Sequence, residues 1–404
     1  MTALPPLAGV RVIDLSRVLG GPWATQILAD HGADVIKIEP PSGDETRRWG
    51  PPFETDAAGA IVSSAYYGGT NRNKRGLALD LALPEAREVL LRLLHRADVM
   101  VENFRAGTMA RWGLDYQRDL KPRFPRLVYA RVCGFGDDGP LGGAPGYDAV
   151  AQAMTGLISV NGSQQSGPMR IGVPIVDLAA GMNAALGILM ALQARQKSGE
   201  GAFIEATLFD TGLSLLYPHG PNWLNGGRVA ERTGSAHANI VPYDLFATAS
   251  GDIFLGVGTD RQFEKLLKIL GAPEIAQEPR FASNADRGRN RNALRAELER
   301  LLASHDAEPL AAKLLAAGVP AGAVEGIAQA LHSPQASHRH TVVEAQGYRA
   351  VGSPIRFDGA PPGITRPPPR FAEHTDEILT EAGYTEQAIA RLVSTGAVVR
   401  KMRP

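Results

Sequence analysis

The stretch VRVIDLSRVLGGPWATQILADHGADVIKIE, residues 10–39, decides the fold. Residues 10–15 and 33–39 are short apolar runs rich in β-branched side chains, which is typical of buried strands. Between them, residues 20–22 (GGP) mark a turn and residues 23–31 have helical spacing. The stretch therefore predicts a strand, a helix and a second strand, the repeating unit of a parallel sheet.

The same alternation continues through the N-terminal half of the chain. Further strand patterns occur at residues 76–81, 98–102 and 126–132, and a helical pattern occupies residues 84–97. Strands that alternate with helices predict an α/β fold with a doubly wound, Rossmann-like sheet.

A change in composition marks the expected domain boundary. Residues 221–233 are loop-like and rich in Asn and Gly, so we place a linker there. Residues 1–220 then form the large domain. Residues 234–326 carry strand and helix patterns of their own and are expected to form a smaller α+β domain.

Composition restricts the function classes. The chain has 404 residues, with 42 Lys plus Arg and 42 Asp plus Glu, which argues against nucleic acid or an acidic membrane surface as the main partner. The single cysteine, Cys133, cannot form an internal disulfide, and its strand-like neighbours predict a small buried apolar side chain. We find no leader pattern and no run of 18 or more apolar residues, so we expect a cytoplasmic protein without a membrane span.

Asp177 is the most informative single residue. It follows the run RIGVPIV, residues 170–176, and opens a long apolar helical pattern that reaches about Lys197. Local sequence favours a helix N-cap, because Asp is among the best capping residues and the N–H groups and dipole of a helix start would keep it ionised. The alternative is a carboxylate nucleophile at the edge of an apolar site.

Other motifs are weaker. Residues 134–139, GFGDDG, match the letters of a dinucleotide fingerprint, but two Asp side chains stand where a pyrophosphate would lie and no clear helix follows. The cations of residues 71–76, NRNKRG, suit a ligand with several phosphates, or else a solvated turn. The His residues form no metal pattern, although His237 lies in a small-residue stretch that could approach a ligand. No G-x-S-x-G elbow competes with Asp177 as the nucleophile.

Several blocks together resemble the class III CoA-transferases, the group of formyl-CoA transferase. These blocks are PLAGVRVIDL (6–15), GADVIKIE (32–39), NRNKR (71–75), ADVMVENF (97–104), GYD (146–148) and the segment around Asp177. They span nearly the whole chain in the family's order. The stretch GSAHANIVPY, residues 234–243, looks closest to the succinate–hydroxymethylglutarate, or dicarboxylate, branch.

The resemblance implies a fold, an assembly and a mechanism. Residues 327–404 become a linker and a C-terminal part that returns to the large domain, and two chains interlock as a homodimer. Asp177 aligns with the family's catalytic aspartate, which attacks an acyl-CoA to give a mixed anhydride and then an aspartyl-CoA thioester. Coenzyme A is a substrate in this chemistry, with a small carboxylic acid as its partner, and neither a further cofactor nor a metal is expected.

The resemblance also implies roles for other positions. The CoA groove is expected to use Val18, Leu19, Arg72, Lys74, Arg75, Asn103, Phe104 and Arg111. Lys74 and Arg75 would lie on phosphates, and Tyr147 and Asp148 match a pair near the reacting centre. Formyl-CoA transferase has a glutamine where this chain has Leu19, which disfavours formyl or oxalate chemistry. Arg17, with His237, is instead expected to pair with the distal carboxylate of a dicarboxylic acyl group.

Two alternatives share this fold. An α-methylacyl-CoA racemase needs two opposed acid–base groups and carries a His where this chain has Tyr147, and a phenol is a poor proton shuttle at neutral pH. A non-catalytic CoA-binding homologue would bind CoA without exchanging it. The sequence favours the transferase over both.

Overall fold

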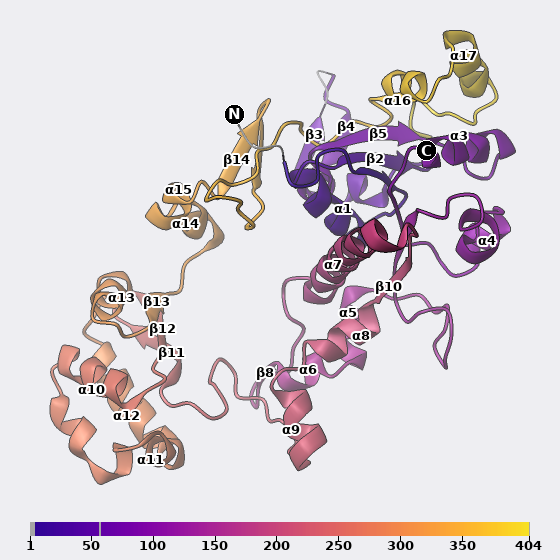
Figure 1. The fold of residues 1–404 in the computed structure, drawn as a ribbon. Coiled ribbons are helices and arrows are strands. Elements are labelled where there is room, and N and C mark those ends of the chain that lie inside the picture. Colours follow the sequence, from indigo (N-terminus) through magenta and orange to yellow (C-terminus); the bar gives the residue numbers. More distant parts are fainter. Residues whose placement is uncertain (1–4, 56–57, 404) are drawn as a thin grey trace. The chain divides into compact units, whose positions relative to one another are not determined.

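The computed structural model describes residues 5–55 and 58–403 and separates the chain into two compact units (Figure 1). The large unit consists of Met1–Leu157, Ile171–Gly220 and Gln335–Pro404, and the small unit of Ile158–Arg170 and Pro221–Pro334. The start of the segment in which we looked for a leader lies outside the described residues.

The observed division differs from the expected one in two places. Residues 158–170 group with the small unit, although we expected residues 1–220 to be one domain. Residues 221–233, the expected linker, also belong to the small unit, whereas the C-terminal part from Gln335 belongs to the large unit, in line with a linker that begins at residue 327. Sequence composition marks where the chain becomes loop-like, but which unit a loop packs on depends on contacts that are distant in sequence.

A six-stranded parallel sheet forms the centre of the large unit, in the order β10-β7-β6-β1-β2-β5. Read from β5, this is the strand order 3-2-1-4-5-6 of doubly wound nucleotide-binding folds. The strands are β1 (Arg11–Asp14), β2 (Asp34–Glu39), β5 (Lys74–Ala78), β6 (Val99–Glu102), β7 (Val128–Cys133) and β10 (Phe203–Thr207). The predicted doubly wound sheet is therefore present.

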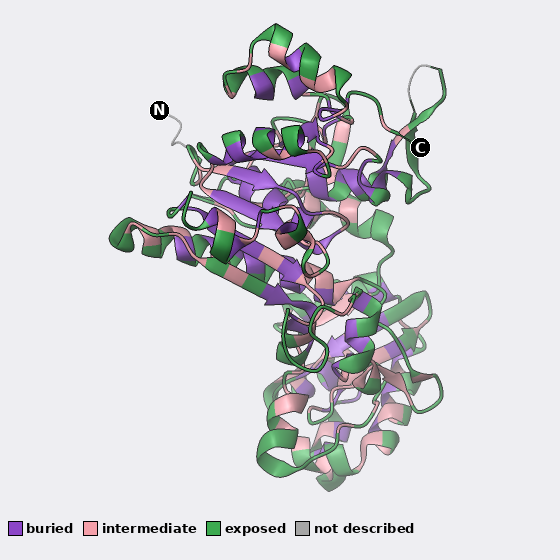
Figure 2. Cartoon of the chain, turned by 90° about the vertical axis from the view of Figure 1, so that its right-hand side faces the viewer, coloured by how far each residue is buried: buried purple, intermediate pink, exposed green. Residues whose placement is uncertain are grey.

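Alternate side chains of the strands bury opposite faces of this sheet. On one face Ile13 and Ile36 pack with α3 (Pro84–Leu94) and with the C-terminal helices α16 (Thr375–Glu381) and α17 (Glu386–Ser394). On the other face Val12 and Val35 pack with α1 (Gly20–Asp30) and α7 (Ile175–Ser198). Figure 2 shows most of this sheet as buried, whereas the edge strand β10 is partly exposed.

The small unit has its own core. Three antiparallel strands, β11 (Tyr243–Thr248), β12 (Gly251–Gly256) and β13 (Ala321–Ala323), pair in that order. Its main helices are α10 (Asp260–Ile269), α12 (Arg291–Leu302) and α13 (Ala307–Ala316), whose buried leucines pack against the strands. This architecture is the α+β unit that the sequence predicts.

Helix α7 bears on the expectation that no helix of the chain spans a membrane. Among the described residues it is the one helix long and apolar enough to cross a membrane by length and composition. Such a result is weak evidence of a span, because a core helix of a soluble protein gives the same result. One face of α7 is indeed core, since Ala180, Ala184 and Ile188 are fully buried.

Candidate active site

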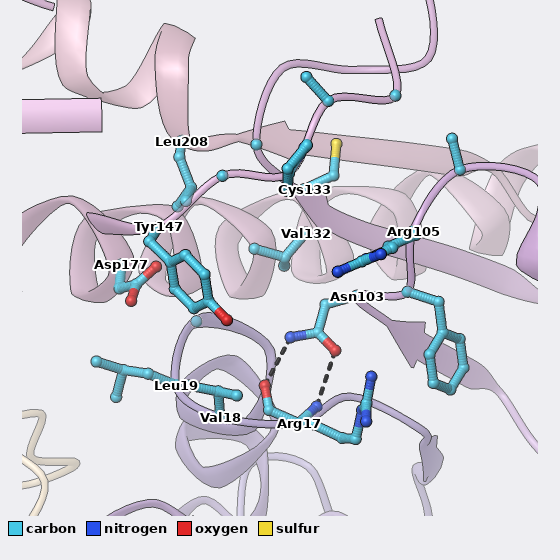
Figure 3. A pocket seen from close by; sticks show the side chains of 18 of the residues that line it. Arg17, Val18, Leu19, Asn103, Arg105, Val132, Cys133, Tyr147, Asp177 and Leu208 are labelled. Carbon is cyan, nitrogen blue, oxygen red and sulfur yellow. Dashed lines mark hydrogen bonds between the residues drawn. The ribbon is translucent and has the colours of Figure 1, made fainter. Parts of the chain in front are cut away.

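The candidate active site is a pocket at the point where the strand order of the sheet reverses. The chain leaves β1 toward β2 on one side, whereas β6 lies on the other side of β1, and ligands of doubly wound sheets bind outside such a junction. The pocket encloses about 210 Å³ and is lined by residues 17–20 after β1, residues 103–106 after β6 and residues 132–134 at the end of β7. Asp177 lies at one end beside Tyr147, and Arg105 lies toward the other (Figure 3).

The loop after β1 is held at three successive residues. Ser16 donates its N–H to Asp14 and its carbonyl accepts from the buried Lys37. The backbone of Arg17 makes a two-way hydrogen bond with the side-chain amide of Asn103, at 2.8 and 2.6 Å (Figure 3). These bonds tie the loop after β1 to the loop after β6 across the junction.

Val18 is strained within this loop. Its φ of 70° lies in the left-handed region, which a β-branched residue rarely adopts. The Val18 N–H is directed at the carboxylate of Asp44, with N···O distances of 3.3 and 3.4 Å. Strain of this kind costs about 1–3 kcal/mol and persists where neighbouring bonds impose it.

Buried ion pairs hold the residues that bond to the loop after β1. Lys37 and Asp44 pair at 2.9 Å, and Lys74 and Asp14 pair at 3.0 Å, with all four side chains removed from solvent. Burial alone would raise the pKa of Asp44, but the ammonium of Lys37 lowers it to about 2. Burial lowers the pKa of Lys74 to about 8, although Asp14 acts against this. The pairs are structural, because their polar atoms are occupied within the fold.

Asp177 is the third residue of α7 and does not cap it. The N-cap is Pro174, which has neither an N–H nor a polar side chain. No described residue donates a hydrogen bond to the Asp177 carboxylate. The expectation that Asp177 is the N-cap, held ionised by helix N–H groups, is therefore wrong.

Asp148 takes the capping role instead. It is the first residue of α5 (Asp148–Met154) and is almost fully buried. Its Oδ1 accepts from the N–H of Val176 at 2.8 Å and from the N–H of Asp177 at 3.3 Å, and its Oδ2 accepts from Gln152 at 2.6 Å. Asp148 is not among the residues that line the pocket, and both of its carboxylate oxygens are bonded within the fold.

The environment of Asp177 favours its neutral form. Burial and, next, the neighbouring Asp148 carboxylate raise the pKa of Asp177 to about 7. The expected ionising effect of the helix start is absent because Asp148 has taken the N–H groups. An unpartnered carboxyl group in this position is half ionised near neutral pH, which suits a group that must attack a carbonyl and later leave it.

The cationic cluster at residues 72–75 is structural. Arg72 binds Asp30, Lys74 binds Asp14, and Arg75 binds Asp34, Glu377 and Glu381. These cations are almost fully buried and line neither this pocket nor the neighbouring one. We therefore withdraw the assignment of Arg72, Lys74 and Arg75 to CoA phosphates, because their side chains are already neutralised by carboxylates.

The other predicted site residues fall into two groups. The pocket collects Arg17, Val18, Leu19, Asn103, Phe104 and Tyr147 with Asp177. Arg111 lies exposed on α4 (Thr108–Arg111), donates to Thr108 and lines neither pocket. His237 belongs to the small unit, where its Nδ1 accepts from the N–H groups of Asn239 and Ile240, so the neutral ring carries its proton on Nε2.

Sequence reasoning missed three features. Arg105 lines the pocket, and its guanidinium has no charged or hydrogen-bonding partner among the described residues. Tyr66, on α2 (Ala65–Asn71), has a pKa raised by burial and then by the carboxylates of Asp177 and Asp148, which places its phenol in their field. A second pocket of about 330 Å³ shares Arg17, Phe104 and Arg105 with the first and continues over residues 38–41 and 79–82. The parallel sheet order, which brings the ends of β1, β2 and β5 together, was the signal that could have located it.

Comparison with known proteins gives one consistent result. Residues 7–375 match the family model described as CoA-transferase family III. A succinate–glutarate CoA-transferase of Agrobacterium fabrum is 40% identical, over 95% of this chain and 97% of the relative. The human succinyl-CoA:glutarate CoA-transferase is 37% identical, over 98% and 91%. A crystal structure of a CAIB/BAIF family protein from Brucella suis is 39% identical and superposes with a TM-score of 0.86, covering 94% of this chain and all of that one.

The raised pKa of Asp177 predicts a stability effect. An Asp has a pKa near 4 in the unfolded chain, so ionised Asp177 destabilises the native state fully above about pH 7 and not at all below about pH 4. Asp177→Asn removes this charge, so the variant should be more stable than wild type at pH 8, by on the order of 2 kcal/mol after allowance for partial solvent contact. Urea denaturation at several pH values measures the difference, which should vanish by pH 4.

The control for this experiment is Asp376→Asn, which removes an exposed carboxylate on α16. It should change stability by no more than about 0.5 kcal/mol at any of these pH values. An Asp177→Asn protein that is equally or less stable than wild type at pH 8 would contradict the assignment of a raised pKa.

Proposed function

The chain belongs to CoA-transferase family III and is a CoA-transferase, and from that premise we propose that it moves CoA from succinyl-CoA to another dicarboxylic acid. The observation that carries the proposal is Asp177, a carboxylate without a hydrogen-bond donor among the described residues, at the end of a pocket at the sheet junction. The names of similar proteins support the substrate class, since they specify glutarate, D-citramalate and mesaconate.

We propose that the Asp177 carboxylate is the nucleophile. It attacks the thioester carbonyl of the acyl-CoA, which gives a mixed anhydride and releases CoA thiolate. The thiolate then attacks the Asp177 carbonyl of the anhydride, forming an aspartyl-CoA thioester and freeing the acid. The acceptor acid repeats these two steps in reverse, and each step exchanges one activated acyl group for another, so no further energy source is needed.

Helix α1, which follows the first strand of the sheet, is suited to stabilise the oxyanions that form in these steps. Helix α1 begins at Gly20, and the Cβ that a side chain would add there lies 3.9 Å from Asp177 Oδ1. The N–H groups of Leu19, Gly20 and Gly21 have no acceptor among the described residues. Free N–H groups beside the nucleophile can donate to the oxygen that becomes negative during attack.

The two adjoining pockets suit the extended shape of CoA. The first pocket, at about 210 Å³, holds only the reacting end of the molecule, because complete ligand sites usually measure about 300–1,000 Å³. The second pocket supplies apolar walls for the nucleotide end. Arg105 and Phe104 line both pockets, so Arg105 is positioned to bind a phosphate between them. This replaces residues 72–75 as the proposed phosphate site.

Arg17 remains our proposed partner for the distal carboxylate of the acid. Its Nη1 lies 3.4 Å from Glu45, a weak and half-exposed pair, and its buried Nε has no hydrogen-bond partner among the described residues. The expectation that Leu19 disfavours oxalate as a substrate stays a prediction, and an acetyl-CoA:oxalate CoA-transferase of Acetobacter aceti is 38% identical to this chain.

The exposed face of α7 supports a homodimer. Met182, Leu186 and Met190 are exposed at helical spacing, and Val150 and Met154 are exposed on α5. A contiguous apolar face of this kind marks an interaction surface, and a second copy is the occupant that an enzyme of this family would supply.

The first prediction concerns the nucleophile. Asp177→Ala should lower exchange of labelled succinate with succinyl-CoA by about 10³-fold or more, because the carboxylate that forms the proposed covalent intermediate is then absent. Wild-type enzyme mixed with succinyl-CoA should gain a CoA adduct on the peptide that contains Asp177, visible by mass spectrometry. Asp210→Ala, outside both pockets, is the control and should retain activity. Exchange by Asp177→Ala within tenfold of wild type would refute this role.

The second prediction separates Arg17 from Arg105. Arg17→Ala should raise the KM for succinate about tenfold while leaving the KM of a monocarboxylic acyl-CoA nearly unchanged, because only a distal carboxylate is lost from recognition. Arg105→Ala should raise the KM of every acyl-CoA by a similar factor. Steady-state kinetics with succinyl-CoA and acetyl-CoA measures both. An Arg17→Ala enzyme that still prefers succinyl-CoA as strongly as wild type contradicts the assignment.

The third prediction concerns assembly. The pair of changes Leu186→Glu and Met190→Glu should convert a dimer into monomers, because two charges would then be buried in an apolar contact. Size-exclusion chromatography with light scattering measures the mass. Leu315→Glu, on an exposed position of α13, is the control and should leave the mass unchanged. A monomeric wild-type protein, or a dimer in the doubly charged variant, would disprove the interface.

A further inference from the structure

We propose that Asp148 is the positioning residue of the active site: it caps α7 from outside the helix, and thereby leaves the Asp177 carboxylate free of hydrogen-bond donors and aimed into the pocket. This inference rests on the proposed role of Asp177 as the nucleophile. It assigns Asp148 a function through Asp177 rather than a contact with substrate.

Each N–H group in the first turn of α7 has a hydrogen-bond acceptor. Ile175 donates to the carbonyl of Val173 at 2.8 Å, and Leu178 donates to the carbonyl of Pro174 at 3.1 Å. The two N–H groups between them, of Val176 and Asp177, both donate to Asp148 Oδ1. A helix normally satisfies such groups with a side chain at its own N-cap. Here a carboxylate 28 residues earlier in the sequence supplies the acceptor.

Pro174 makes this arrangement necessary. A Pro at the N-cap has no side-chain oxygen with which to accept the N–H groups of the first turn. It also has no N–H, so the third helical residue, Asp177, cannot make the reciprocal bond of a capping box. The helix therefore needs an acceptor from elsewhere, and its own first-turn carboxylate has no donor to bind.

The consequence for Asp177 is a more reactive carboxylate. Hydrogen bonds to an ionised carboxylate stabilise it and lower its basicity, whereas a nearby negative charge does the opposite. Asp148 removes the available donors and adds a negative charge, and the pKa of Asp177 is accordingly raised, by burial first and by Asp148 second. Its lone pairs remain free to attack a thioester.

Gln152 extends the arrangement to the chain entering α7. The Gln152 side chain is fully buried on α5, donates to Asp148 Oδ2 at 2.6 Å and accepts from the N–H of Ile171 at 2.9 Å. Ile171 is the residue at which the chain re-enters the large unit. One side chain thus fixes both the orientation of Asp148 and the start of the segment that carries Asp177.

Other ionisable groups face Asp177 from several elements. Tyr147 precedes α5, and Tyr66 lies on α2 within the field of Asp177 and Asp148. The remaining charged or titratable groups that line the pocket are Arg17, Glu45, Arg105, Cys133 and Asp137. Asp148 differs from all of these because it bonds directly to the backbone of Asp177.

A pair of variants tests the proposal. Asp148→Asn places an amide N–H₂ against the N–H₂ of Gln152, so this single change should lower both Tm and kcat, the latter by about 100-fold. Asp148→Asn combined with Gln152→Glu reverses the direction of the hydrogen bond between residues 148 and 152, and the Glu side chain still provides an acceptor for the N–H of Ile171. The double variant should recover Tm and bring kcat to within about tenfold of wild type, with the KM for succinate changed by less than threefold throughout.

The fall of kcat/KM at low pH provides a second measurement, because a residue with only a structural role would not change the pH at which that fall occurs. In the double variant the negative charge lies one helical turn further along α5, so the midpoint of the acid limb of kcat/KM should fall by roughly half to one pH unit. Asp115→Ala is the matched control, because Asp115 also accepts a helix-start N–H, from Arg118, and lines neither pocket. It should lower Tm without moving kcat or the acid limb.

Two outcomes would overturn the proposal. A double variant that regains Tm but remains as inactive as Asp148→Asn, with a raised KM for succinate, would mean that Asp148 contacts the substrate. An acid limb that stays at the wild-type midpoint would mean that Asp148 does not act through Asp177.

A measurement without turnover separates this proposal from the proposed function. The difference in Tm between Asp177 and Asp177→Asn proteins should depend less on pH in the double-variant background than in wild type. If the wild-type protein shows no CoA exchange but this Tm difference responds as expected, the proposed function fails and the role of Asp148 stands.

Discussion

The hydrogen bonds from the N–H groups of Val176 and Asp177 to Asp148 are the interaction on which the rest of the site depends. They satisfy a helix start that Pro174 leaves uncapped. They also contribute, after burial, to the raised pKa of Asp177, since a carboxylate that bound those N–H groups itself would be a more stable anion and a poorer nucleophile. The same two bonds therefore complete the helix and prepare the reacting group.

The opposite wall of the pocket depends on buried charge. Lys37, Asp44, Lys74 and Asp14 are fully removed from solvent and hold the loop after β1. Removing either member of such a pair leaves an uncompensated buried charge, which typically costs about 3–5 kcal/mol. This rigidity maintains the strained Val18 and keeps the N-terminus of α1 beside Asp177. The proposed nucleophile and the proposed oxyanion donors belong to different helices, and a separate network of bonds positions each of them.

The sequence predicted the sheet, the small α+β unit and the location of Asp177 at the start of a long apolar helix, because these follow from local periodicity. It misassigned the cations of residues 72–75 for a physical reason. Their partners Asp30, Asp34 and Glu381 lie 42, 41 and 306 residues away, and no local pattern reveals such pairs. The cap on α7 was misassigned for the same reason, although Pro174 could have indicated that the cap must come from elsewhere. Arg105 was missed because an unpaired arginine is recognised only when its surroundings are known.

The proposed mechanism requires Asp177 to exchange oxygen with the acids whose CoA the enzyme transfers. When the acceptor carboxylate attacks the aspartyl-CoA thioester, one of its oxygens bridges the anhydride, and attack of the thiolate on the acceptor's carbonyl leaves that oxygen on Asp177. Incubation with succinyl-CoA and succinate labelled with ¹⁸O in both carboxylates, followed by peptide mass spectrometry, tests this directly. We predict ¹⁸O in the peptide that contains Asp177 and in no other peptide. Turnover without label in that peptide would contradict the anhydride route and, with it, the role assigned to Asp177.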